Sequence, residues 1–234
     1  MKHLKLSAVT LGVALALAAT SVSQALPTIR ITDGITTITV QDNIGADGSP
    51  QAGFVQYTAP AGTFAGWSVI LSAGTTKPII GSATKPELDL NWSITRTAGA
   101  GTGSLTVYFS ENGFNLASAT AAQTASGGTL GSSAANSATI RTYYDGANTE
   151  LLTTSLLTSQ TFNGPNPFGQ VANGNVPADP TVAFTVRLDL VQAAGQITSG
   201  DIHLYVNAPE GGSMVTFLGT ALLALGAFAA RRKA

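Results

Sequence analysis

The side chains of this sequence best suited to chemistry are two carboxylates, Glu87 and Asp89, which lie two residues apart. On a β-strand they share one face, with side chains about 6–7 Å apart. Glycosidases use two carboxylates at such distances, but normally from different strands that face each other across a cleft. Any exposed strand face shows the same spacing, so we expect Glu87 and Asp89 to be ordinary solvated residues.

His203 is the one histidine beyond the N-terminal segment, and Asp201 precedes it by two residues. The two side chains would share a strand face, which makes an Asp–His pair conceivable. A hydrolase would also need a nucleophile on a sharp turn, and the sequence contains no G-x-S-x-G motif. A single histidine without any cysteine nearly excludes an ordinary zinc site. We therefore expect no catalytic residue, no resident metal and no cofactor.

Two loops are rich in the oxygen ligands that Ca²⁺ prefers. They contain Asp42, Asn43 and Asp47 in one case, and Asp145, Asn148 and Glu150 in the other. Neither loop has the D-x-D-x-D-G run of a dedicated calcium loop, and Asx residues in tight turns explain both without a metal. The sequence does not decide whether these loops bind calcium.

Threonine and aromatic residues suggest two kinds of binding surface. Two pairs of threonines lie two residues apart, Thr37 with Thr39 and Thr95 with Thr97. Ice-binding surfaces are built from such pairs, but they need the pair repeated on successive strands. Threonine is also common in strands of a half-exposed sheet, which explains both pairs without ice binding. Sugar binding would use exposed aromatic rings. The candidates are Trp67, Trp92, Tyr57, Tyr108, Tyr143, Tyr144 and Tyr205, of which we expect both tryptophans in the core.

The charge pattern excludes several classes of partner. Six basic residues lie between the two ends of the chain, and acids outnumber them: Arg30, Lys77, Lys85, Arg96, Arg141 and Arg187. Because they are scattered in the sequence, we expect no binding to nucleic acid and no docking on anionic polymers or lipids. The absence of cysteine rules out disulfides and thiol catalysis.

The elements that would position these residues are β-strands. Apolar and polar residues alternate along 87–95, 104–109, 181–190 and 201–206, and more weakly along 28–32, 35–41, 53–58, 66–72 and 138–144. Asp33-Gly34 predicts a hairpin over 28–41. Leucines 151–157 fit either a short helix or a strand. We expect one antiparallel β-sandwich of jelly-roll type over residues 26–207.

Two stretches of low complexity interrupt this pattern. Residues 117–137 are almost entirely Ala, Ser, Thr and Gly, so we expect a long surface loop there. Residues 163–179 contain three prolines, which excludes a central strand.

The N-terminus is typical of a secretory signal peptide. Lys2 and Lys5 precede an apolar stretch that runs to Ala19, and small residues lead up to Ala25. We expect residues 1–25 to be removed between Ala25 and Leu26.

The C-terminus combines a short motif, an apolar segment and a basic end. Residues 214–230 are apolar throughout and long enough for a short transmembrane helix. The positive residues that follow should hold this end in the cytoplasm: Arg231, Arg232 and Lys233. The motif before the helix consists of Pro209, Glu210, Gly211, Gly212 and Ser213.

In this order, the three features of residues 208–234 resemble the PEP-CTERM sorting signals of Gram-negative bacteria, in the variant that usually reads V-P-D-G-G-S. The chain has Ala208 where that variant has Val, and Glu210 where it has Asp. The resemblance implies an exosortase-type enzyme as partner, transient anchoring in the inner membrane, and release to the cell surface or the exopolysaccharide matrix.

The sequence therefore predicts an exported, non-catalytic protein with a structural role in that matrix. A carbohydrate-binding module of the matrix is the alternative. A glycoside or ester hydrolase and an ice-binding protein are further possibilities.

Overall fold

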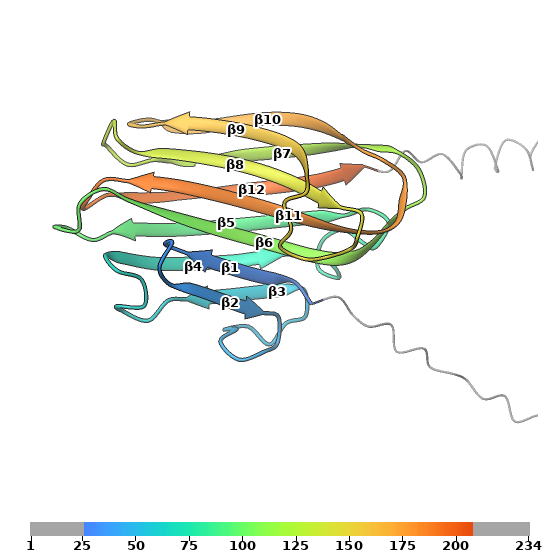
Figure 1. Ribbon diagram of the computed structural model, residues 1–234, viewed down its shortest axis with the longest axis horizontal. Helices are drawn as coiled ribbons and strands as arrows, with labels where there is room; N and C mark the ends of the chain where they lie inside the picture. Colours follow the sequence, from blue (N-terminus) through green and yellow to red (C-terminus); the bar gives the residue numbers. More distant parts are fainter. Residues whose placement is uncertain (1–25, 208–234) are drawn as a thin grey trace, which may run out of the picture.

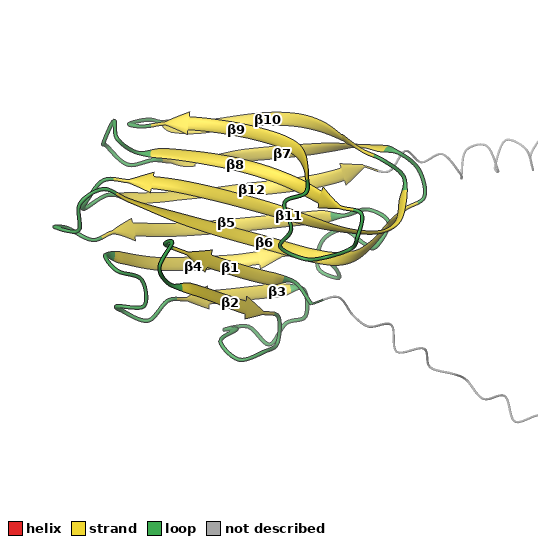
Figure 2. Ribbon diagram, in the orientation of Figure 1, coloured by secondary structure: helices red, strands yellow, loops and turns green. Residues whose placement is uncertain are grey.

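The computed structural model describes residues 26–207, and all its regular elements within that range are β-strands (Figures 1 and 2). There are twelve: β1 Thr28–Thr32, β2 Thr37–Gln41, β3 Phe54–Thr58, β4 Trp67–Thr75, β5 Glu87–Arg96, β6 Gly103–Leu116, β7 Thr120–Thr129, β8 Ser137–Asp145, β9 Ser155–Asn163, β10 Pro167–Val176, β11 Asp179–Gln192 and β12 Ile197–Asn207. The predicted all-β class is confirmed.

The strands form two antiparallel sheets of six. Sheet A has the order β2-β1-β6-β11-β8-β9, and sheet B has the order β10-β7-β12-β5-β4-β3. The last eight strands by themselves have the jelly-roll arrangement of two four-stranded sheets, and β1, β2, β3 and β4 extend one side of it. Figure 1 looks through both layers, with β9 and β10 at one side and β2 and β3 at the other.

The core lies between the two sheets and follows from the alternation in the sequence. Along β5 every second residue is buried, from Leu88 to Ile94, and the residues between them are half-buried. All four strongly alternating segments are strands here, β5, β6, β11 and β12, and so are the five weaker ones. Both Trp67 and Trp92 belong to the core, as predicted.

The predicted hairpin over 28–41 is present. Strands β1 and β2 pair from Thr28 with Gln41 to Thr32 with Thr37. The Asp33 carboxylate accepts hydrogen bonds from the backbone N–H groups of Ile35 and Thr36, and Gly34 has a φ of 87°. A positive φ favours glycine, so the turn pair determines the register.

The expectation of a surface loop over residues 117–137 is wrong. Strand β7 occupies most of this stretch and lies inside sheet B, between β10 and β12. The small residues do not prevent packing because neighbouring strands supply the bulky side chains. Residues 163–179 contain β10, which is an edge strand and not a central one, as the prolines indicated. The undecided leucines lead into strand β9.

A stack of aromatic rings shows why β7 needs small residues. The rings of Trp92 and Phe168 stack with centroids 6.5 Å apart, although two strands lie between β5 and β10. Those strands carry Gly200 and Gly128 on the inner face. A Cβ on Gly200 would lie 2.5 Å from Cζ2 of Trp92, so only glycine leaves room for the ring.

The predicted signal peptide, sorting motif, apolar helix and basic end lie outside the described residues. Within residues 26–207 no helix has the length and apolar character needed to cross a membrane.

Candidate functional site

The outer face of sheet B gathers the carboxylates and the histidine that the sequence singled out. Strands β5 and β12 pair so that His203 lies opposite Asp89, and Asp201 lies opposite Asn91. Apolar neighbours on both strands point into the core, which turns these polar side chains outward. We name Glu87, Asp89, Asp201 and His203 the acidic cluster.

Short contacts hold the acidic cluster together. The Asn91 amide donates a hydrogen bond of 2.6 Å to Oδ1 of Asp89. Nε2 of His203 lies 3.5 Å from Oε2 of Glu87, an ion pair when the imidazole is protonated. The predicted sharing of faces, Glu87 with Asp89 and Asp201 with His203, is thus confirmed. Their pairing across two strands was not predicted, because alternation within a strand does not determine its partner.

Asp89 differs from the ordinary solvated residue that the sequence suggested. Partial burial, and the nearby carboxylate of Asp201, raise the pKa of Asp89 to about 6. His203 acts in the opposite direction and lowers it. Near neutral pH this carboxyl group therefore accepts protons far more readily than a carboxyl group in water.

Small residues border the cluster on the side of β7. Ala125 lies next to His203 and Gly127 next to Asp201 in the register of β12 with β7. In the adjacent row Tyr205 lies next to Gln123, whose amide donates a hydrogen bond of 3.3 Å to Asn173 of β10. The outer face of sheet B therefore has acceptors, amides and one half-buried tyrosine beside a strip where side chains are short.

The chemistry of this face suits the binding of hydroxyl groups. Carboxylates accept hydrogen bonds, amides both donate and accept them, and a tyrosine ring offers a surface for stacking. The face belongs to one sheet, and the carboxylates come from two adjacent strands instead of opposite walls.

The two oxygen-rich loops already use their side-chain oxygens within the protein. Asp42 accepts a hydrogen bond of 2.8 Å from the N–H of Gly53, and Asp47 accepts one of 2.8 Å from the N–H of Asn43. Asp145 accepts from the N–H of Thr149 at 3.0 Å. In the part of the chain that the structure describes, no three His, Asp or Glu side chains are grouped to hold a metal.

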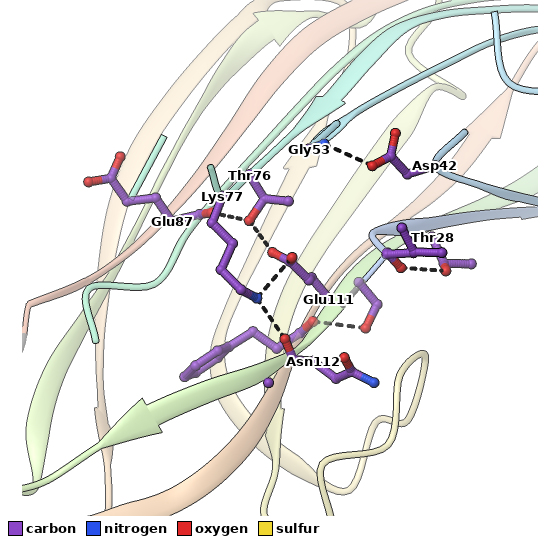
Figure 3. A network of polar contacts seen from close by, with 12 residues as sticks. Thr28, Asp42, Gly53, Thr76, Lys77, Glu87, Glu111 and Asn112 are labelled. Carbon is purple, nitrogen blue, oxygen red and sulfur yellow. Dashed lines mark hydrogen bonds and ion pairs between the residues drawn. The ribbon is translucent and has the colours of Figure 1, made fainter. Parts of the chain in front are cut away.

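The structure contains a buried ion pair that the sequence did not indicate (Figure 3). Nζ of Lys77 lies 2.8 Å from Oε1 of Glu111 and 2.7 Å from the carbonyl oxygen of Asn112, above the ring of Phe114. Glu111 is fully buried, which raises its pKa to about 7, and burial lowers the pKa of Lys77. A one-residue bulge in β6 opposite β11 accompanies this inward carboxylate, and no alternation pattern predicts it.

The basic residues are less scattered in space than in the sequence. Arg30, Arg187 and Arg141 lie in one row across the outer face of sheet A, with Tyr108 between the first two. Thr32, Thr37 and Thr106 lie in the neighbouring row. On β2, Thr39 continues the pair into the row of Arg30, but β1 and β6 have arginine and tyrosine in that row, so the threonines do not form the ladder that an ice-binding surface requires.

No protein-family model matches this chain, and the search of curated proteins found no match either. Among solved structures, the chain is similar to the K1 cleaved adhesin domain of Lys-gingipain from Porphyromonas gingivalis W83, with a TM-score of 0.34 and 13% identity over 66% of this chain and 95% of that one.

Two carbohydrate-binding modules are similar at the same level. The module TmCBM61 in complex with β-1,4-galactotriose gives a TM-score of 0.29 and 12% identity over 62% of this chain and 90% of that one. A carbohydrate-binding module of promiscuous specificity from the β-sandwich superfamily gives a TM-score of 0.30 and 14% identity over 77% of this chain and 70% of that one. Similarity at this level does not assign a function.

Proposed function

We propose that this protein is an exported, non-catalytic β-sandwich that binds a neutral polysaccharide with the outer face of sheet B. The single observation that carries the proposal is the acidic cluster, which puts several hydrogen-bond acceptors beside Tyr205 and the short side chains of β7. Sugar hydroxyl groups donate to such acceptors, and a polymer can lie along a face whose side chains are short.

The destination supports the same proposal. The signal peptide and the PEP-CTERM-like segment of the sequence would bring the protein to the cell surface or the exopolysaccharide matrix, after cutting by an exosortase-type enzyme. In that matrix the protein meets polysaccharide at high concentration. A structural role without a specific ligand is the second candidate, and it shares the same address.

Binding can be tested with the full chain kept in detergent, using dextran, β-glucan and galactan as probes. We expect at least one of them to bind, and the double variant Glu87→Gln, Asp89→Asn to bind it at least tenfold more weakly, a loss of about 1.4 kcal/mol or more. Asp179→Asn removes one carboxylate from sheet A and is the control for loss of a carboxylate outside the acidic cluster.

Three outcomes separate the candidates. Binding that is lost in the double variant but not in Asp179→Asn supports the carbohydrate-binding role. Absence of binding to every neutral polymer leaves the structural role. Turnover of a glycoside or ester that disappears in the double variant would instead identify a hydrolase.

A further inference from the structure

The outer face of sheet A carries a second cluster, which the proposed function does not use. We name Arg30, Tyr108, Arg187 and Arg141 the arginine row. They are consecutive partners in the register of β1, β6, β11 and β8. Because neighbouring strands lie about 4.8 Å apart, the row spans about 14 Å across the sheet.

Contacts within the row fix the directions of the guanidinium groups. Cζ of Arg30 lies 4.3 Å from the centroid of the Tyr108 ring, and Cζ of Arg187 lies 5.3 Å from it. Arg187 also donates to Oδ1 of Asp189 through Nε at 3.0 Å and through an Nη at 2.8 Å. Arg141 donates to the other oxygen of Asp189 at 2.7 Å. Tyr108 and Asp189 thereby hold the arginines in defined positions.

Charge on this face is not balanced. Asp189 is shared between Arg187 and Arg141, so these three residues with Arg30 carry a net charge of about +2 at neutral pH. Within residues 26–207 no carboxylate forms an ion pair with Arg30. The side chains of Arg141 and Arg187 keep 34% and 30% of their surface exposed, so solvent and ligands reach them.

The rows on either side of the arginine row are rich in hydroxyl groups and contain few charges. On one side Thr28 donates a hydrogen bond of 2.8 Å to Oε2 of Glu150. The neighbouring row across the sheet contains Asp189 and five threonines: Thr37, Thr32, Thr106, Thr139 and Thr161. On the outer face of sheet A these hydroxyls lie beside the guanidinium groups and can bond to a ligand that carries both hydroxyl and carboxylate groups.

We propose that the arginine row binds the carboxylate groups of an acidic polysaccharide of the polyuronate type. Guanidinium groups bind carboxylates in a two-pronged geometry, and Tyr108 positions two of them along one line. Arg30 and Arg187 are the residues that contact the polymer, while Arg141 positions Arg187 through Asp189. A net charge near +2 suits the spaced charges of a uronate chain better than the dense charge of nucleic acid.

This proposal uses a different face from the one assigned to neutral sugars, so each can fail without the other. With both faces functional, one molecule would connect an acidic polymer to a neutral one.

The test measures binding of the full chain in detergent to polygalacturonate, with dextran, dextran sulfate and duplex DNA as comparisons. We expect binding to polygalacturonate that weakens as salt is added. The double variant Arg30→Gln, Arg187→Gln should weaken it at least tenfold and leave binding to a neutral polymer unchanged. Glu87→Gln with Asp89→Asn should not weaken it.

Two further variants separate a built site from general charge. Lys85→Glu changes the net charge by the same two units as the double variant and should leave binding nearly unchanged. Arg30→Lys with Arg187→Lys keeps the charge but loses the forked geometry, and should still weaken binding severalfold. Melting curves establish that each variant is folded.

The proposal is overturned if polygalacturonate does not bind, or if the arginine variants bind it as the parent does. It is also overturned if Lys85→Glu weakens binding as much as the double glutamine variant, because the attraction would then be non-specific. Equal or tighter binding of dextran sulfate or DNA would assign the row to sulfate or phosphate groups instead of uronates.

Discussion

At the residue scale, Asp89 has the most informative environment on the outer face of sheet B. Its carboxyl group is half-buried, next to Asp201, and held by the Asn91 amide. Burial and a second negative charge both oppose its ionisation, and His203 offsets only part of this. The ionised carboxylate of Asp89 therefore lowers the stability of the folded protein, a cost that is common at binding surfaces.

The effect of Asp89 on stability depends on pH in a direction that can be measured. The pKa of Asp89 rises from 3.8 to about 6 on folding, so the folded protein binds more protons than the unfolded chain between these values. The contribution of Asp89 to the free energy of unfolding is thus unchanged below about pH 4 and falls as the pH rises to about 6. Glu111, with a pKa of about 7, extends the fall to higher pH.

We predict that Asp89→Asn stabilises the protein at pH 7 by about 1 kcal/mol, after allowance for solvent screening of a half-exposed group, and changes little at pH 4. Urea denaturation of residues 26–207 at both pH values measures the difference. Asp179→Asn is the control. Equal effects of Asp89→Asn at pH 4 and pH 7 would contradict the raised pKa.

The residue scale also shows what a sequence can and cannot reveal about a site. Alternation places Glu87 with Asp89, and Asp201 with His203, on common faces. It does not show that the two pairs are neighbours, because that depends on β12 pairing with β5, more than a hundred residues away in the chain. The arginine row was missed for the same reason: its members come from four different strands.

At the scale of elements, β7 shows how composition can mislead. Residues 117–137, a run of Ala, Ser, Thr and Gly, have too little bulk to build a core alone, and for this reason the sequence predicted a loop there. In the sandwich the run lies beneath the rings of Trp92 and Phe168, where bulk would not fit. Strong alternation identified β5, β6, β11 and β12 because their own side chains supply the apolar surface.

Two adjacent glycines of β7 allow this explanation to be tested. A Cβ on Gly128 would lie 2.7 Å from Cα of Gly200 and 2.9 Å from Cζ of Phe168, whereas one on Gly127 would have its nearest neighbour at 3.6 Å. We predict that Gly128→Ala destabilises the protein by about 1–3 kcal/mol and Gly127→Ala by under about 0.5 kcal/mol. Urea denaturation midpoints give both values, and similar midpoints would refute the close packing.

At the scale of the whole molecule, the two outer faces of the sandwich differ in charge. Sheet B presents the acidic cluster, and sheet A presents the arginine row. Two faces that differ in charge would suit a protein that binds two different polymers, as proposed above. The address that would bring it there remains a prediction from the two ends of the sequence.

The address is tested by mass spectrometry of surface and secreted material. We predict a mature chain that begins at Leu26 and lacks residues 214–234, because the signal peptide and the sorting segment are removed in turn. Deletion of the exosortase-type enzyme should leave the C-terminal segment attached. An intact C-terminus in mature surface material would contradict the processing, although not the export.

The position of β12 has a consequence for the order in which the molecule forms. Of the strands within residues 26–207 this one is synthesised last, yet it lies in the interior of sheet B, between β7 and β5. Until Ile197–Asn207 leave the ribosome, sheet B consists of two separate parts with unpaired edges, and the core cannot close. Folding governed by such distant pairings is slow. A nascent chain would therefore stay unfolded long enough for the export that the sequence predicts. A chain that ends before Ile197 would expose two unpaired strand edges, which favour aggregation.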